Sequence, residues 1–135
     1  ELDRYDSENL VRRKEIFAHY NSFFSAYDWG NIPLYKTEEK EGSYHLFLLR
    51  INDIQEEKRD EIIQKIFDLD VSVNVHFQPL PMLTAYKNAG FEMKDYPESF
   101  NSYKNVITLP VYFDLTDEQL NTICNAVKSA VESSI

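Results

Sequence analysis

Large apolar residues recur at helical spacing over the first 28 positions, with charged residues such as Arg12 and Arg13 between them. This pattern predicts one amphipathic entry helix over about residues 1–28. Its apolar positions are Leu2, Tyr5, Leu10, Phe17, Tyr20, Phe24 and Tyr27. The pattern has begun by Leu2 with no capping residue before it, so we expect either a chain cut from a longer one or a disordered start.

Three segments have the patterns of β-strands. Residues 44–51 are almost continuously apolar, which is typical of a central strand. Residues 71–77 alternate with period two, and residues 106–112 form a third strand that Pro110 interrupts. In the alternating strand, the apolar face carries Val71, Val73, Val75 and Phe77. The polar face carries Ser72, Asn74 and His76.

Three further helices are predicted by their caps and stripes. Asp53, with Glu56 three positions later, predicts a capped helix that ends near residue 67. The buried stripe expected for that helix is Ile62, Ile63, Ile66 and Phe67. A short helix follows over residues 82–90 and stops at Gly90. Thr116 and Gln119 form a capping box at the start of the last helix.

Together these elements predict one α+β domain over residues 1–135. We expect a two-layer sandwich with a small, mostly antiparallel sheet of three to four strands and helices packed mainly on one face. Aromatic residues make up 14% of the chain, more apolar surface than one helical layer covers. We therefore expect some of them to be exposed on an open face, with Tyr20, Phe24, Tyr44 and Phe77 as candidates.

Composition excludes several classes of function. The net charge of −9 disfavours nucleic acid and anionic membranes as partners. No apolar run is long enough to span a bilayer, and the single cysteine, Cys124, indicates a reducing compartment, so we expect a cytoplasmic protein. With three glycines in 135 residues, the chain cannot form a glycine-rich phosphate loop.

His76 is the strongest candidate for chemistry, because it lies at a strand end beside a proline-rich loop. Taken locally, the pattern favours a structural histidine that is hydrogen-bonded to a backbone carbonyl. A zinc site from His45, His76 and Cys124 lacks the short ligand spacing that such sites have. No serine has the neighbours of a nucleophile elbow, and we expect no catalytic residue and no metal ligand in this chain.

The segments "VSVNVHFQPLPMLTAYKNAGF", "DYPESF" and "VITLPVYFDLTDEQL" resemble the C-terminal part of the DegT/DnrJ/EryC1/StrS family of sugar aminotransferases. The resemblance implies a small domain that docks on a large domain, absent from this chain, which binds pyridoxal phosphate. We expect no cofactor contact from this chain. The family's loop beside the substrate falls on His76, Phe77 and Pro79, so we expect substrate contacts from His76, Phe77, Asn74 and Tyr86.

The resemblance further implies a homodimeric enzyme that transfers an amino group, from glutamate, to a keto-sugar on a nucleotide. The small domain would close the cleft and be inactive alone. Two departures bear on this: Pro81 stands where many members have a second histidine, and Asp70 where a glycine is common. The alternative is a stand-alone binding module that kept the fold without catalysis. A small enzyme using His76 alone is disfavoured by the lack of a partner base.

Overall fold

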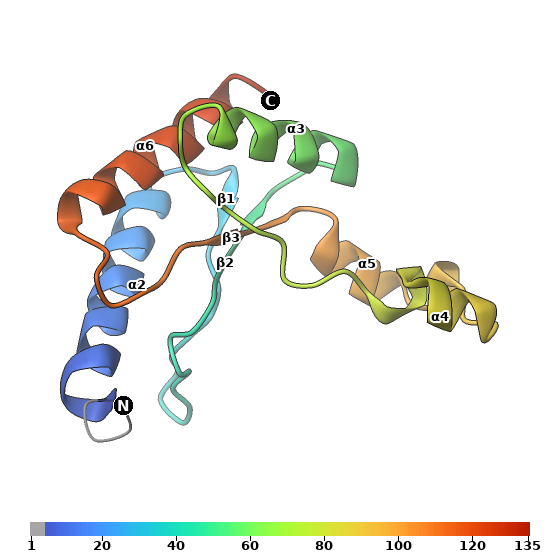
Figure 1. The fold of residues 1–135 in the computed structure, drawn as a ribbon, viewed down its shortest axis with the longest axis horizontal. Coiled ribbons are helices and arrows are strands. Elements are labelled where there is room, and N and C mark those ends of the chain that lie inside the picture. The colour runs from blue at the N-terminus through green and yellow to red at the C-terminus, as the bar shows by residue number, and fades with distance from the viewer. Residues whose placement is uncertain (1–4) are drawn as a thin grey trace.

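Three antiparallel strands form a sheet of order β1-β2-β3 in the computed structural model, which describes residues 5–135 (Figure 1). The strands are β1 (Gly30–Asn31), β2 (Phe47–Ile51) and β3 (Val106–Leu109). Buried residues alternate along β2, so Phe47, Leu49 and Ile51 share one face. The fold class and the central position of this strand are confirmed.

Three long helices pack on that face of the sheet: α2 (Leu10–Phe24), α3 (Glu56–Phe67) and α6 (Asp117–Glu132). A short π-helical segment, η1 (Tyr5–Asn9), precedes α2. The predicted entry helix therefore ends at Phe24 and not near residue 28, while Leu2 lies outside the described residues. Tyr20 and Phe24 of α2 and the loop residue Tyr44 are buried in the core, so the prediction that they are exposed is wrong, whereas Phe77 is exposed as predicted.

The two predicted helix caps have opposite outcomes. At α6, the Thr116 hydroxyl accepts from the Gln119 N–H at 3.2 Å and the Gln119 side chain accepts from the Thr116 N–H at 2.9 Å, so the capping box is confirmed. At α3, the N-cap is Gln55, and Asp53 lies two residues earlier with a φ of 59°. Asp53 is therefore a turn residue, and its predicted capping role is wrong.

The predicted strand over residues 71–77 is reduced to a single bridge between Asn74 and Thr108. Both backbone hydrogen bonds of that pair form, at 3.1 and 2.7 Å. In this register one of the two neighbouring bonded pairs would be Ser72 with Pro110, and proline has no N–H to donate, so the ladder stops on that side. Val71 and Val73 are buried as predicted, but Phe77 is 74% exposed and does not share their buried face.

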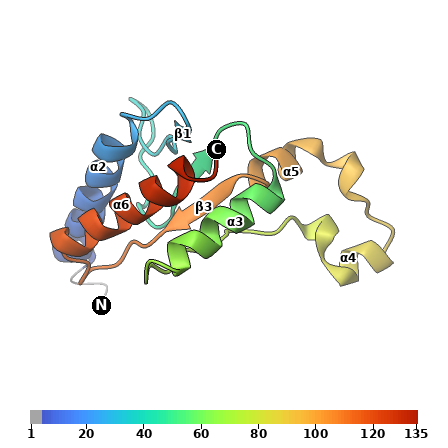
Figure 2. The same ribbon diagram turned by 90° about the horizontal axis from the view of Figure 1, so that it is seen from above.

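An arm over residues 78–104 projects from the body in both ribbon views (Figures 1 and 2). It contains η2 (Leu80–Met82), α4 (Thr84–Asn88), η3 (Met93–Asp95) and α5 (Pro97–Tyr103). Gly90, with a φ of 89°, follows α4 as predicted. Within α4, η3 and α5 the only buried residue is Tyr103. Exposed apolar side chains of the arm are Leu80, Leu83, Tyr86, Phe91 and Tyr96.

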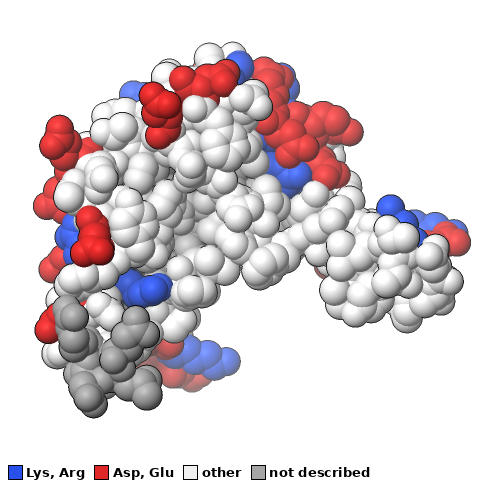
Figure 3. Space-filling model, viewed as in Figure 1, with Lys and Arg blue, Asp and Glu red and all other residues white. Residues whose placement is uncertain are grey.

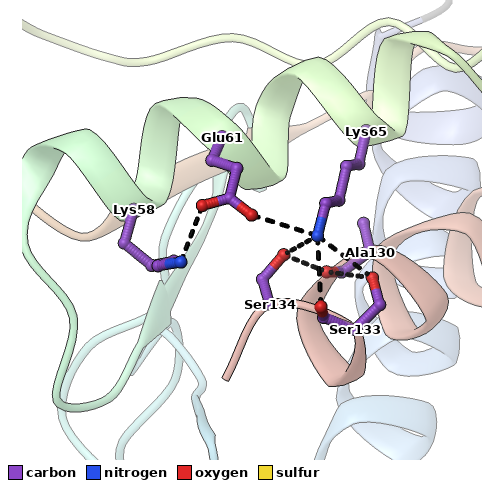
Figure 4. Close-up of polar contacts among 6 residues, drawn as sticks. All are labelled: Lys58, Glu61, Lys65, Ala130, Ser133 and Ser134. Carbon is purple, nitrogen blue, oxygen red and sulfur yellow. Dashed lines mark hydrogen bonds and ion pairs between the residues drawn. The ribbon is translucent and has the colours of Figure 1, made fainter.

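Polar contacts tie the arm and the last helix to α3. The buried Arg59 donates to the carbonyl oxygen of Tyr103 at 2.9 Å, and its guanidinium lies 4.7 Å from the centre of the Tyr103 ring. At the other end of α3, Lys65 donates to the carbonyl of Ser133 and the hydroxyl of Ser134 (Figure 4). The arm is thus anchored at α5, and the end of α6 is fixed against α3.

Candidate functional site

The polar face predicted for residues 71–77 lines a pocket of about 310 Å³ together with β3. In the sheet register Thr108 stands opposite Leu48 on one side and opposite Asn74 on the other. Residues directly opposite each other in antiparallel pairs share a face, so this pocket lies on the face away from the three helices. Its lining residues are His45, Leu46, Ser72, Val73, Asn74, His76, Thr108, Leu109, Pro110 and Val111.

His76 contributes an unpaired imidazole nitrogen to this region. Its Nδ1 atom is buried and has no hydrogen-bond partner among the described residues. The local interpretation as a structural histidine called for a bond to a backbone carbonyl, and Nδ1 makes none. The ring of Phe77 lies edge-on to the His76 ring with the centres 4.5 Å apart. The imidazole is therefore held by ring packing with this nitrogen unbonded.

Asn74 and Thr108 add two further polar groups to the pocket. The Asn74 side-chain oxygen accepts from the Val75 N–H at 2.7 Å, so a ligand would meet the amide N–H groups of Asn74. Thr108 is 4% exposed, and its hydroxyl oxygen has no hydrogen-bond partner among the described residues. Sequence reasoning did not single out Thr108; the signal was a lone hydroxyl within the otherwise apolar run "VITLP".

The other two predicted substrate residues lie outside the lining. Phe77 projects into solvent beside His76. Tyr86 belongs to α4 of the arm, is 38% exposed and packs near Phe91 with ring centres 6.0 Å apart. The structure thus brings Asn74 and His76 together and leaves Phe77 at the rim and Tyr86 on the arm.

The lining of this pocket includes no Lys, Arg, Asp or Glu. The nearest cation that bonds to a lining residue is Arg13, whose guanidinium lies 3.3 Å from Nδ1 of His45. Pyridoxal phosphate requires a lysine amine for its aldehyde, a carboxylate for its ring nitrogen and donors for its phosphate. The residues of this pocket do not fit that cofactor.

One further hollow and the single thiol differ from this pocket. A larger hollow of about 650 Å³ lies beside Trp29 and the start of α3, and its lysine, Lys58, is paired with Glu61 at 2.6 Å. Burial raises the pKa of Cys124 to about 12, so this thiol is protonated and unreactive near neutral pH. Within residues 5–135, no three His, Cys, Asp or Glu side chains lie close enough to hold a metal ion.

Charged side chains are unevenly distributed over the surface (Figure 3). Acidic side chains gather over α3, whereas the surface between the body and the arm is largely uncharged in this view. No helix in the described part of the chain combines the length and apolarity needed to cross a bilayer. The fold and the neutral pocket define a small α+β domain with an open sheet face and a projecting arm.

The chain belongs to the DegT/DnrJ/EryC1/StrS aminotransferase family, whose model matches residues 1–128. It is similar to the putative sugar aminotransferase Spr1654 from Streptococcus pneumoniae in its PMP-form, with 41% identity and a TM-score of 0.94. That match covers 99% of this chain and 33% of the other. The resemblance to this family and the prediction of a small α+β fold are confirmed.

Two curated relatives are likewise matched over about a third of their own length. MJ1066 of Methanocaldococcus jannaschii is 32% identical over 91% of this chain and 32% of its own length. The spore coat polysaccharide biosynthesis protein SpsC of Bacillus subtilis (strain 168) is 27% identical over 99% of this chain and 35% of its own length. The chain therefore spans about a third of the length of the relatives it matches.

Proposed function

We propose that this chain is the small domain of an enzyme that uses pyridoxal phosphate to transfer an amino group, from glutamate, to a keto-sugar carried on a nucleotide. The observation that carries the proposal is the neutral pocket at His76, with unpaired polar atoms on the open sheet face. Family membership and a relative described as a putative sugar aminotransferase support it.

In this proposal the chain contributes substrate contacts and the rest of the enzyme contributes the cofactor. The pocket lining has no lysine, so the amine that binds the cofactor comes from the large domain of the same polypeptide. His76, Asn74, Phe77 and Tyr86 face the sugar side of the cleft. The small domain closes that cleft, the enzyme is a homodimer, and the chain alone is inactive.

His76→Ala in the full-length protein tests the division of roles. Loss of one neutral hydrogen bond predicts a fall of about tenfold in turnover of the keto-sugar nucleotide, while the absorption spectrum of the bound cofactor stays as in wild type. His19→Ala, a half-buried histidine of α2, is the matched control and keeps full turnover. Loss of bound cofactor in His76→Ala would show that His76 contacts the cofactor, which contradicts its proposed substrate role.

The absence of a cofactor-binding lysine is tested on the chain itself. Mixing it with pyridoxal phosphate and reducing with borohydride should leave no stoichiometric adduct at one lysine, because no lysine lines the pocket. One lysine labelled completely and selectively would contradict the proposed division. A natural protein of this length that binds a ligand without any transaminase partner would favour the module.

A further inference from the structure

We infer that Thr108 is a substrate-contacting residue of the pocket and that it binds an uncharged hydroxyl of the sugar. The inference rests on the proposed function, and it assigns a residue that neither the sequence motifs nor the resemblance singled out. Three observations lead to it: an unpaired buried hydroxyl, a fixed backbone and a neutral lining.

The Thr108 hydroxyl makes no hydrogen bond that would stabilise the fold. The side chain is 4% exposed, and its oxygen has no partner among the described residues. A buried hydroxyl without a partner is destabilising, whereas valine has nearly the same shape and no polar atom to leave unpaired. A threonine in this position is therefore better explained by an external partner than by packing.

The backbone on both sides of Thr108 fixes the direction of its side chain. Its N–H donates to the Asn74 carbonyl at 2.7 Å and its carbonyl accepts from the Asn74 N–H at 3.1 Å. On the other side it pairs with Leu48 of β2. Because opposite residues share a face, the Thr108 and Asn74 side chains extend to the same side. Thr108 therefore lines the pocket from the same face as Asn74.

The chemistry of the lining selects the kind of group that is bound. Threonine hydroxyl both donates and accepts, the Asn74 amide donates, and the His76 nitrogen takes either role with its tautomer. Diphosphates are held mainly by Arg, Lys or helix N-termini, and the lining includes neither Lys nor Arg. A sugar hydroxyl, which also donates and accepts, fits this set, whereas the diphosphate of the same substrate does not.

The test compares Thr108→Val, which removes the hydroxyl, with Thr108→Ser, which keeps it, in the full-length protein. We expect Thr108→Val to lower kcat/KM for the keto-sugar nucleotide about tenfold, and Thr108→Ser to stay within about twofold of wild type. The amino-donor half-reaction should be unchanged in both variants. The melting temperature of Thr108→Val should equal that of wild type or exceed it by about 3 °C, since an unpaired polar atom is removed.

Thr122→Val is the matched control, because the Thr122 hydroxyl has a partner in the Glu118 carbonyl at 3.0 Å and lies on α6. It should leave kcat/KM unchanged. The inference is overturned if Thr108→Val keeps wild-type kcat/KM. It is also overturned if this variant melts at a lower temperature and loses both half-reactions together, since the hydroxyl would then be structural.

A binding measurement separates failure of this inference from failure of the proposed function. If the wild-type protein turns over no keto-sugar nucleotide, the proposed function fails, and NMR of the Thr108 methyl group decides the inference. UDP-glucose should shift that resonance and UDP should not. No shift with UDP-glucose, or an equal shift with UDP, would overturn the assignment of a sugar hydroxyl to Thr108.

Discussion

The anchor between α3 and the arm makes Arg59→Ala the most informative perturbation of stability. Arg59 is 2% exposed, donates to the Tyr103 carbonyl at 2.9 Å and stacks 4.7 Å from the centre of the Tyr103 ring. It also contacts Asp60 at 2.6 Å and Glu56 at 3.4 Å. Removing the guanidinium leaves the buried carbonyl of Tyr103 without its donor, since the alanine side chain cannot replace it.

The magnitude follows from the kinds of contact that are lost. A hydrogen bond from a charged donor contributes about 1.5–3 kcal/mol, and a desolvated cation over an aromatic ring about 1–2 kcal/mol. The pair with Asp60 adds little, because that carboxylate is 60% exposed. We therefore expect Arg59→Ala to lower the free energy of unfolding by about 3–4 kcal/mol.

Urea unfolding of the chain, followed by circular dichroism at a helical wavelength, measures this loss as a shift of the midpoint. Lys58→Ala is the control on the same helix, because Lys58 pairs with Glu61 at the surface (Figure 4) and should cost less than about 1 kcal/mol. Amide exchange should also become faster across α5 in Arg59→Ala alone. A cost below about 1 kcal/mol for Arg59→Ala, or equal costs in both variants, would refute the anchoring role.

Three further outcomes are expected. Burial raises the pKa of Cys124 to about 12 from an ordinary 9.0, so the unfolded state ionises first as pH rises. The free energy of unfolding should therefore fall between about pH 9 and 12, and more steeply than in Cys124→Ala; equal slopes in urea titrations would contradict this. Thr116→Ala should lose about 1 kcal/mol by removing the α6 cap, and Thr84→Ala, at a helix start without a side-chain cap bond, should lose less. Tyr20→Phe should cost about 1 kcal/mol, because the Tyr20 hydroxyl donates to the Pro110 carbonyl at 2.9 Å; a gain in the unfolding midpoint would argue against that bond.

Local signals in the sequence predicted those elements whose determinants lie close together in the chain. The capping box of Thr116 and Gln119 spans three residues, and Gly90 ends α4 by its own conformation. The alternation over residues 71–77 grouped Ser72, Asn74 and His76, which line one pocket, although Val73 of the opposite predicted face lines it too. It could not predict that the ladder stops at Ser72, because that depends on Pro110 in a distant segment.

The missed features depend on contacts between segments far apart in the sequence. Arg59 stands in a charged run, and its burial depends on Tyr103, which is 44 positions away. Thr108 can be recognised as a pocket residue only when Asn74 is known to lie opposite it. Phe67 was predicted on the buried stripe of α3 but is 43% exposed at its last position. Periodicity alone does not indicate which turn of a helix still faces the core.

The projecting arm has a consequence for how this domain can diversify. Because α4, η3 and α5 bury only Tyr103, substitutions elsewhere in these elements leave the packing of the body unaffected. A replacement of the arm would keep its anchor to the body only if it retained Tyr103, which receives Arg59, and the buried Pro81 of η2. Substitutions at the exposed apolar positions of the arm would change its surface while the core of the body stays the same. Stability and surface properties are therefore set by separate segments: the body carries the core, and the arm carries exposed apolar side chains.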